Sequence, residues 1–180
     1  GPGQFVEPQG IAFSPDGGVF VCDSYACRVQ KFTAEGEYLL GWGGPGTGNG
    51  LFMGPLGITC DGDGFVYVSE CYSHRLQKFA PDGAFVSAWG SAGTGGGFFN
   101  CPTGIAAGAD GRIFTVDYGN DRVQIFTAAG LPLSTLGFGG SGDGGFDGPV
   151  GIAVSANGDL FVTDSGNRRV QRFAAIIRNE

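Results

Sequence analysis

Charge is scarce in this sequence: Asp, Glu, Lys and Arg make up 15% of its 180 residues, and histidine occurs once, at His74. Disordered chains combine high charge with few aromatic residues, so the 13% aromatic fraction argues against disorder. A single histidine also restricts acid–base and metal chemistry, for which histidine is the usual side chain. No apolar run reaches the length of a transmembrane helix, and we expect neither such a segment nor a signal peptide in this chain.

Basic residues are few as well. Ten Lys and Arg against 17 Asp and Glu give a formal net charge of −7. Nucleic-acid phosphates and anionic membranes attract positive charge, so we expect neither as a partner. The five cysteines have spacings that fit neither a zinc ribbon nor a disulfide framework. Their odd number favours free thiols and a reducing compartment, although the sequence leaves the compartment itself open.

Glycine and phenylalanine are abundant instead, with 37 and 16 residues, and both follow an internal repeat. Positions 47 residues apart carry the same residue in four consecutive copies, without insertion or deletion. Periods of this length are typical of solenoids and propellers. In the first copy the eight invariant positions are Phe5, Pro8, Gly10, Ile11, Gly17, Arg28, Gln30 and Phe32.

Each copy predicts four short strands and no helix. In the first copy the strands are expected at residues 10–13, 19–23, 28–32 and 38–42. An Asp-Gly or Asn-Gly pair lies between the first two, and such pairs supply the positive backbone angles of tight hairpins. Short strands separated by turn signals indicate antiparallel all-β structure, and four of them per repeat are typical of a β-propeller blade.

The repeat resembles the NHL repeat. The clearest copy is Phe146–Phe173, with the sequence FDGPVGIAVSANGDLFVTDSGNRRVQRF, and the similarity extends over essentially the whole chain. The resemblance implies an all-β protein, a β-propeller of NHL-type four-stranded antiparallel blades. Such propellers usually have six blades and serve mainly as binding platforms. We expect one domain over residues 1–180, with blade repeats at 1–47, 48–94, 95–141 and 142–180.

The last repeat has no clear fourth strand, because residues 177–180 lack the turn glycine and the aromatic residue of the other copies. Three arrangements are open. The four repeats belong to a larger, six-bladed ring, or another chain completes the ring, or four blades close on themselves. We favour the first two over the third, and self-association to complete the ring is therefore one expected interaction.

An acid precedes each invariant arginine by five residues, across the turn between the second and third strands. Four arginines could surround a ligand, but an acid and an arginine beside one tight turn are also well placed to pair. Because the pattern recurs in every copy, we interpret the pairs as structural. They are Asp23 and Arg28, Glu70 and Arg75, Asp117 and Arg122, and Asp164 and Arg169.

Function in a propeller is expected where the copies differ, and they differ in this same turn. Its side chains give one face an aromatic, hydrogen-bonding character suited to a protein or peptide partner. We therefore predict a non-enzymatic interaction or scaffold module without a cofactor. The predicted partner-binding residues are Tyr25, Tyr72, His74, Tyr118 and Arg168.

The alternatives are an enzyme and an RNA-binding protein. NHL-like propellers resemble lyases, and a metal-dependent lyase is the enzymatic alternative, but one histidine cannot supply several ligands. The sequence brings only Cys27, Cys71 and His74 together as metal candidates, and we expect no metal there, with free thiols at the cysteines. RNA binding is least favoured, because the remaining basic residues are scattered over different repeat positions.

Overall fold

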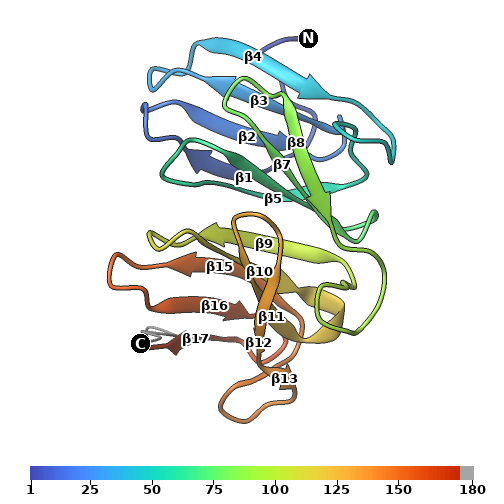
Figure 1. The fold of residues 1–180 in the computed structure, drawn as a ribbon, viewed down its shortest axis with the longest axis vertical. Coiled ribbons are helices and arrows are strands. Elements are labelled where there is room, and N and C mark those ends of the chain that lie inside the picture. The colour runs from blue at the N-terminus through green and yellow to red at the C-terminus, as the bar shows by residue number, and fades with distance from the viewer. Residues whose placement is uncertain (175–180) are drawn as a thin grey trace.

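The computed structural model describes residues 1–174, and the fourth-strand prediction for residues 177–180 lies outside this range. Within it the chain is all-β, as the sequence predicts, and forms four antiparallel blades in a propeller-like arrangement. The first two blades form the upper half of Figure 1 and the last two the lower half. No helix among these residues is long and apolar enough to cross a membrane.

Strands are hydrogen-bonded in chain order within each blade. The first blade contains β1 (Pro8–Phe13), β2 (Val19–Asp23), β3 (Arg28–Phe32) and β4 (Tyr38–Gly43). The second contains β5 (Pro55–Cys60), β6 (Val66–Glu70), β7 (Arg75–Phe79) and β8 (Phe85–Trp89). The third contains β9 (Pro102–Ala107), β10 (Arg112–Asp117), β11 (Arg122–Thr127) and β12 (Pro132–Leu136), with a 3-10 turn at Tyr118–Asn120. In the described residues the fourth contains β15 (Pro149–Val154), β16 (Leu160–Asp164) and β17 (Arg169–Phe173).

Glycine-rich connectors fold back where one blade leads to the next. The last of them pairs β13 (Phe138–Gly139) with β14 (Gly145–Phe146) in parallel. The corresponding contacts in the earlier connectors are single bridges, Pro45 with Phe52 and Ala92 with Phe99. The excess glycine thus belongs to ordered chain reversals that recur with the repeat.

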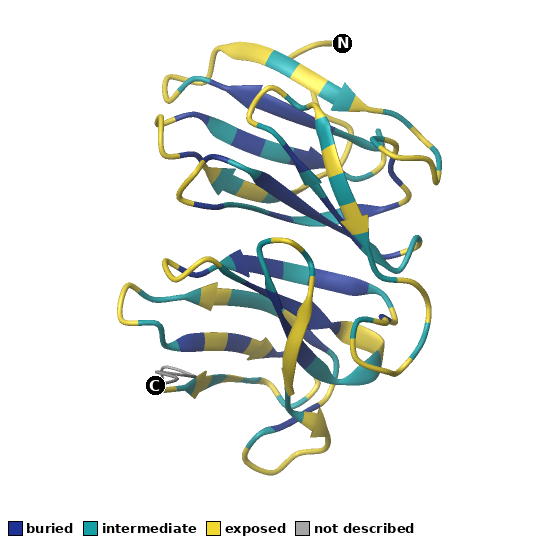
Figure 2. Cartoon of the chain, in the orientation of Figure 1, coloured by how far each residue is buried: buried dark blue, intermediate teal, exposed yellow. Residues whose placement is uncertain are grey.

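The hydrophobic core lies between the blades. Phe20 and Val29 of the first blade pack with Phe52 and Phe79 of the second, and all four side chains are buried. Trp42 bridges the two sheets, with its ring centroid 5.9 Å from that of Phe20 and 5.6 Å from that of Phe79. Figure 2 shows buried residues along the middle strands and exposed ones along the outer strands β4 and β8. Each blade therefore has two apolar faces, one for each neighbour.

The invariant glycine of the first strand allows neighbouring blades to approach closely. A Cβ at Gly10 would lie 2.6 Å from the Leu56 carbonyl oxygen of the next blade. A Cβ at Gly104 would lie 2.6 Å from the Val150 carbonyl oxygen, again in the next blade. Real Cβ atoms do not occur at such separations, so the repeat needs glycine wherever another first strand lies beside it.

Candidate functional site

Each repeated acid forms an ion pair with the arginine five residues later. The carboxylate is fully buried in every blade, and the guanidinium is partly covered. The nitrogen–oxygen distances are 3.2 Å for Arg28–Asp23, 2.6 Å for Arg75–Glu70, 2.8 Å for Arg122–Asp117 and 2.8 Å for Arg169–Asp164.

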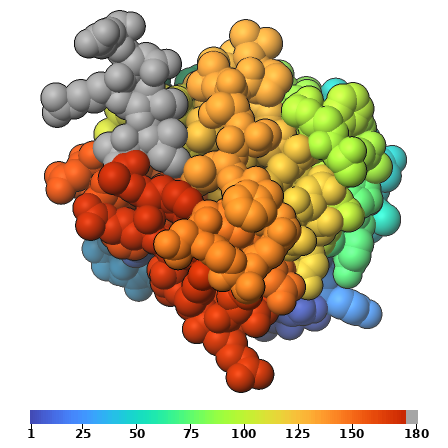
Figure 3. Space-filling view, turned by 90° about the horizontal axis from the view of Figure 1, so that it is seen from below, coloured from blue at the N-terminus to red at the C-terminus, as the bar shows by residue number. Residues whose placement is uncertain are grey.

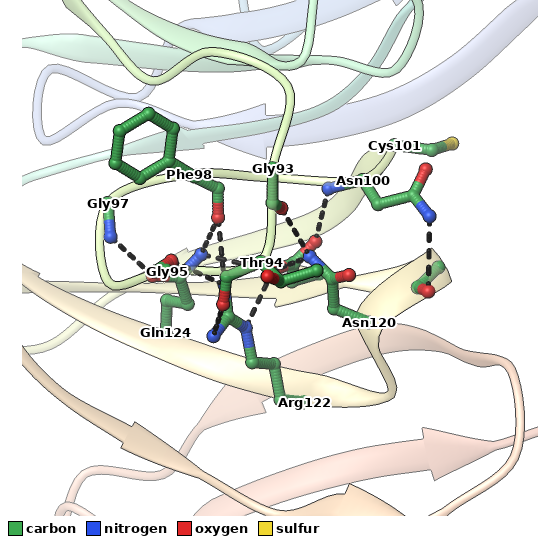
Figure 4. Close-up of polar contacts among 12 residues, drawn as sticks. Gly93, Thr94, Gly95, Gly97, Phe98, Asn100, Cys101, Asn120, Arg122 and Gln124 are labelled. Atoms are coloured by element: carbon green, nitrogen blue, oxygen red, sulfur yellow. Dashed lines mark hydrogen bonds and ion pairs between the residues drawn. The ribbon is translucent and has the colours of Figure 1, made fainter.

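In the third blade the arginine of the pair also binds the connector that precedes the blade (Figure 4). Besides Asp117, the Arg122 guanidinium donates to the Thr94, Gly95 and Phe98 carbonyl oxygens at 2.7, 2.8 and 2.9 Å. Gln124 donates to the same Phe98 oxygen at 2.6 Å and accepts from the Gly97 amide at 2.9 Å. The invariant Arg and Gln thus fix the preceding connector, and the protein's own oxygens occupy their donors.

In two of the four pairs, those of Asp23 and Asp164, the pKa of the buried carboxylate is lowered. Burial raises the pKa of Asp23, but the amides of Glu7 and Val6 and the Arg28 guanidinium outweigh it, so the net pKa lies below the usual value. For Asp164, burial is again outweighed, here by the Asp147 amide, Arg169, Asn167 and Gln171, and the pKa is lowered.

We use the name turn face for the four turns between second and third strands, residues 24–27, 71–74, 118–121 and 165–168. The last residue of each turn has a left-handed backbone, with φ of 51° at Cys27, 51° at His74, 50° at Asp121 and 55° at Arg168. In two of the turns its side chain reaches the next blade. His74 Nδ1 accepts the Cys101 amide at 3.1 Å, and Asp121 accepts the Gly148 amide at 2.9 Å.

A groove of about 330 Å³ opens on the turn face between the first two blades. The predicted residues Tyr25 and Tyr72 both line it, and they are 75% and 73% exposed. Met53 and Leu56 add apolar surface, and Glu7 adds a carboxylate.

The other predicted contact residues lie outside this groove. Tyr118 is exposed and packs beside Gly148, while Arg168 is exposed in the last turn. His74 is partly buried, and its Nδ1 is engaged by the Cys101 amide as described above. Met53 was not predicted from the sequence, because it lies in a connector, between the invariant Phe and Pro, where the repeat carries no strand signal.

One of the metal candidates must be corrected. Cys71 forms a disulfide with Cys101, so the expectation of a free thiol at Cys71 is wrong and this sulfur is not a metal ligand. Cys27 remains a partly exposed free thiol. Among residues 1–174, no three His, Cys, Asp or Glu side chains are grouped so that they could hold a metal ion. With one disulfide present, the cysteine count no longer argues for a reducing compartment.

A second concavity of about 310 Å³ lies on the propeller axis. The first strands β1, β5, β9 and β15 all line it, mainly through the glycine and isoleucine of the invariant Gly-Ile pair. No charged side chain lines it. It offers backbone and methyl groups, whereas the groove on the turn face offers tyrosines and a carboxylate.

The NHL repeat matches the chain four times, at residues 5–32, 52–79, 99–126 and 146–173. These segments make up more than half of the sequence. The chain belongs to the NHL-repeat family. Every matched segment runs from the connector Phe to the end of the third strand, and so contains the acid, the Arg and the Gln that fix the connector. No curated protein matches the chain.

Solved structures with the same fold include two lyases and a nidogen/laminin complex. A streptogramin B lyase is 20% identical with a TM-score of 0.69, over 93% of this chain and 51% of that one. A virginiamycin B lyase from Staphylococcus aureus with quinupristin is 19% identical with a TM-score of 0.69, over 95% and 56%. A nidogen/laminin complex is 16% identical with a TM-score of 0.73, over 93% and 60%. This NHL-repeat chain therefore spans between half and two thirds of these proteins, and at such identities the likeness shows the fold alone.

Proposed function

We propose that this NHL-repeat chain is a non-enzymatic interaction module that binds a protein or peptide through the groove on the turn face. The observation that carries the proposal is the pair of exposed tyrosines, Tyr25 and Tyr72, on either side of an apolar depression. Tyrosine contributes a large apolar ring and a hydroxyl with little conformational entropy to lose, and it is enriched in binding hot spots.

The lining specifies the chemistry of the ligand. Met53 and Leu56 suit an apolar or aromatic side chain, because a thioether and a branched aliphatic group adapt to its shape. The Glu7 carboxylate and the chain's net charge of −7 favour a ligand with a basic residue next to that apolar one. The nidogen/laminin structure supports a binding role in a general way, since its propeller is part of a protein assembly.

A lyase is the second candidate, supported only by the fold shared with the streptogramin-type lyases. We place it second because His74 is the one histidine, and its Nδ1 is already engaged by the Cys101 amide.

The test is selection of peptides from a displayed random library, followed by titration calorimetry on the best binder. Tyr25→Ala and Tyr72→Ala should each weaken binding at least tenfold, as expected for the loss of a hot-spot aromatic. Leu133→Ala is the matched control, an exposed residue of an outer strand, and should leave the affinity unchanged. Equal affinities for all four proteins would exclude the groove as the binding site.

A further inference from the structure

A buried backbone amide in the wall of the groove has no hydrogen-bond acceptor. Gly54 is buried and lines the groove on the turn face. Its carbonyl oxygen accepts the Cys71 amide at 3.0 Å, but among residues 1–174 its own amide nitrogen donates no hydrogen bond. Buried backbone amides are nearly always paired, because an unpaired one has lost its hydrogen bonds to water without compensation. The Gly54 amide is therefore a donor without an acceptor in the described chain.

At the next two blade junctions a side chain of the turn face accepts the equivalent amide. His74 Nδ1 accepts the Cys101 amide at 3.1 Å, and an Asp121 carboxylate oxygen accepts the Gly148 amide at 2.9 Å. In both cases the acceptor is the last residue of the preceding turn, 27 residues earlier in the chain. Figure 3 shows the third and fourth blades, coloured yellow to red, packed directly against each other. These junctions are closed, and their amides are paired.

The residue 27 positions before Gly54 is Cys27, which also lines the groove. Its φ of 51° equals that of His74, so the turn ends in the same way. A thiol is only a weak acceptor, and the contact of the Cys27 sulfur is with the Tyr25 carbonyl oxygen at 3.9 Å. The exchange of a strong acceptor for a thiol thus leaves the Gly54 amide unpaired.

The missing acceptor is not a consequence of where the sequence begins or ends. Both blades at this junction are complete four-stranded sheets, and the connector between them is continuous. The backbone at Gly54 has φ of 64°, close to the 57° and 56° of its equivalents Cys101 and Gly148. The difference between the junctions therefore lies in one side chain, at position 27, and the junction that lacks the acceptor is the one where the groove opens.

We infer that a peptide bound in the groove supplies this acceptor, an amide carbonyl oxygen that receives the hydrogen bond of the Gly54 amide. The inference rests on the proposed function and adds a polar contact to its apolar and basic ones. A neutral carbonyl suits the site better than a carboxylate, because Glu7 lines the same groove and the net charge is −7. The Tyr72 ring lies beside Gly54, since a Cβ at this glycine would be 2.5 Å from the ring atom Cδ2. One peptide can thus contact the tyrosine and the amide together.

The test uses the peptide selected from the displayed library, synthesised with an acetylated N-terminus and an amidated C-terminus. Cys27→Asn places a neutral carbonyl where Asp121 has its carboxylate, and asparagine tolerates a left-handed backbone. Its side chain should accept the Gly54 amide within the protein and leave the peptide carbonyl unpaired. Cys27→Leu has a similar size and no acceptor. In titration calorimetry, Cys27→Asn should bind the peptide about tenfold more weakly than Cys27→Leu does.

The amide resonance of Gly54 gives a readout that needs no comparison of affinities. In proton–nitrogen correlation spectra of the unmodified protein, the Gly54 amide proton should shift downfield when the peptide binds, because it gains a hydrogen bond. In Cys27→Asn it should already lie downfield without peptide and should move little on binding. A Gly54 resonance that stays in place when the peptide binds the unmodified protein would overturn the inference.

The affinities separate this inference from the proposed function. Weaker binding by Tyr25→Ala and Tyr72→Ala, with equal binding by Cys27→Asn and Cys27→Leu, would overturn the inference and leave the groove as the binding site. Unchanged binding by both tyrosine variants would reject the groove, and the inference with it.

Discussion

Replacement of Gly104 by alanine should be costly, whereas the same change at Gly151 should not. The two residues occupy the same position of consecutive repeats, so alanine has the same intrinsic effect on the strand and on the unfolded chain. The Cβ at Gly104 would lie 2.6 Å from the Val150 carbonyl oxygen, 3.0 Å from the Ile152 amide nitrogen and 3.1 Å from the Gly151 Cα. All three atoms belong to the backbone of the next blade and cannot rotate away.

The magnitude follows from two opposing effects. Overpacking against a fixed neighbour costs about 1–3 kcal/mol, and loss of a glycine from the unfolded chain returns about 0.4–1 kcal/mol. Because the clash at Gly104 is with backbone, we expect a net loss near the upper end, about 2 kcal/mol. At Gly151 the 3.1 Å approach to a hydroxyl oxygen is relieved by a small rotation of Thr163. We expect a change between zero and a gain of about 0.5 kcal/mol there.

The assay is urea unfolding followed by tryptophan fluorescence, at protein concentrations low enough for the chain to be monomeric. The difference between the two variants isolates the effect of the neighbouring blade, since everything local is matched. Equal losses of stability at both positions would show that the cost comes from the strand itself and not from the packing of blades.

Three further predictions concern the links within and between blades. Cys101→Ser removes a disulfide between residues 30 positions apart and should lower the free energy of unfolding in urea by about 3–4 kcal/mol. Dithiothreitol treatment of the unmodified protein should lower it by the same amount. If neither change had an effect, the disulfide would be contradicted. Asp23 and Asp164 have a lower pKa in the folded chain than in the unfolded chain, where the pKa of Asp is about 3.9, so their ionised forms stabilise the fold. The free energy of unfolding should therefore fall as the pH drops below about 4. An unfolding free energy that stayed constant below about pH 4 would contradict the buried ion pairs. Arg122→Gln should cost about 3 kcal/mol because it leaves a buried carboxylate without its ion pair. Arg172→Gln should cost less than about 1 kcal/mol, because the Arg172 side chain is 63% exposed and its pair with Asp159 is screened by water.

Repetition made the fold predictable. Two features recur in every blade: a turn glycine such as Gly17, with φ of 84°, and an ion pair such as that of Asp23 with Arg28. The structure of the clearest copy therefore predicts that of the other three. The disulfide could not be found in this way. Cys71 lies in a turn and Cys101 precedes a first strand, at different repeat positions, and only the packing of neighbouring blades brings them together.

The candidate site was predictable only in part. Tyr25 and Tyr72 stand out because the residue at their repeat position differs between the four copies of the turn. Met53, which also lines the groove, lies in a connector whose path the sequence does not predict. The repeat does not show which copies of one of its positions are exposed. Ile11 and Ile58 are the same residue at the same repeat position, and only the presence or absence of a neighbouring blade distinguishes them.

Amide hydrogen exchange, measured with and without the selected peptide, shows whether the peptide binds in the groove. We expect added protection at residues 24–27, 53–56 and 71–74, where the turns and the connector of the first two blades meet. Protection confined to the strands around the central concavity, at residues 9–11, 56–58, 103–105 and 150–152, would contradict it and move the binding site to the propeller axis.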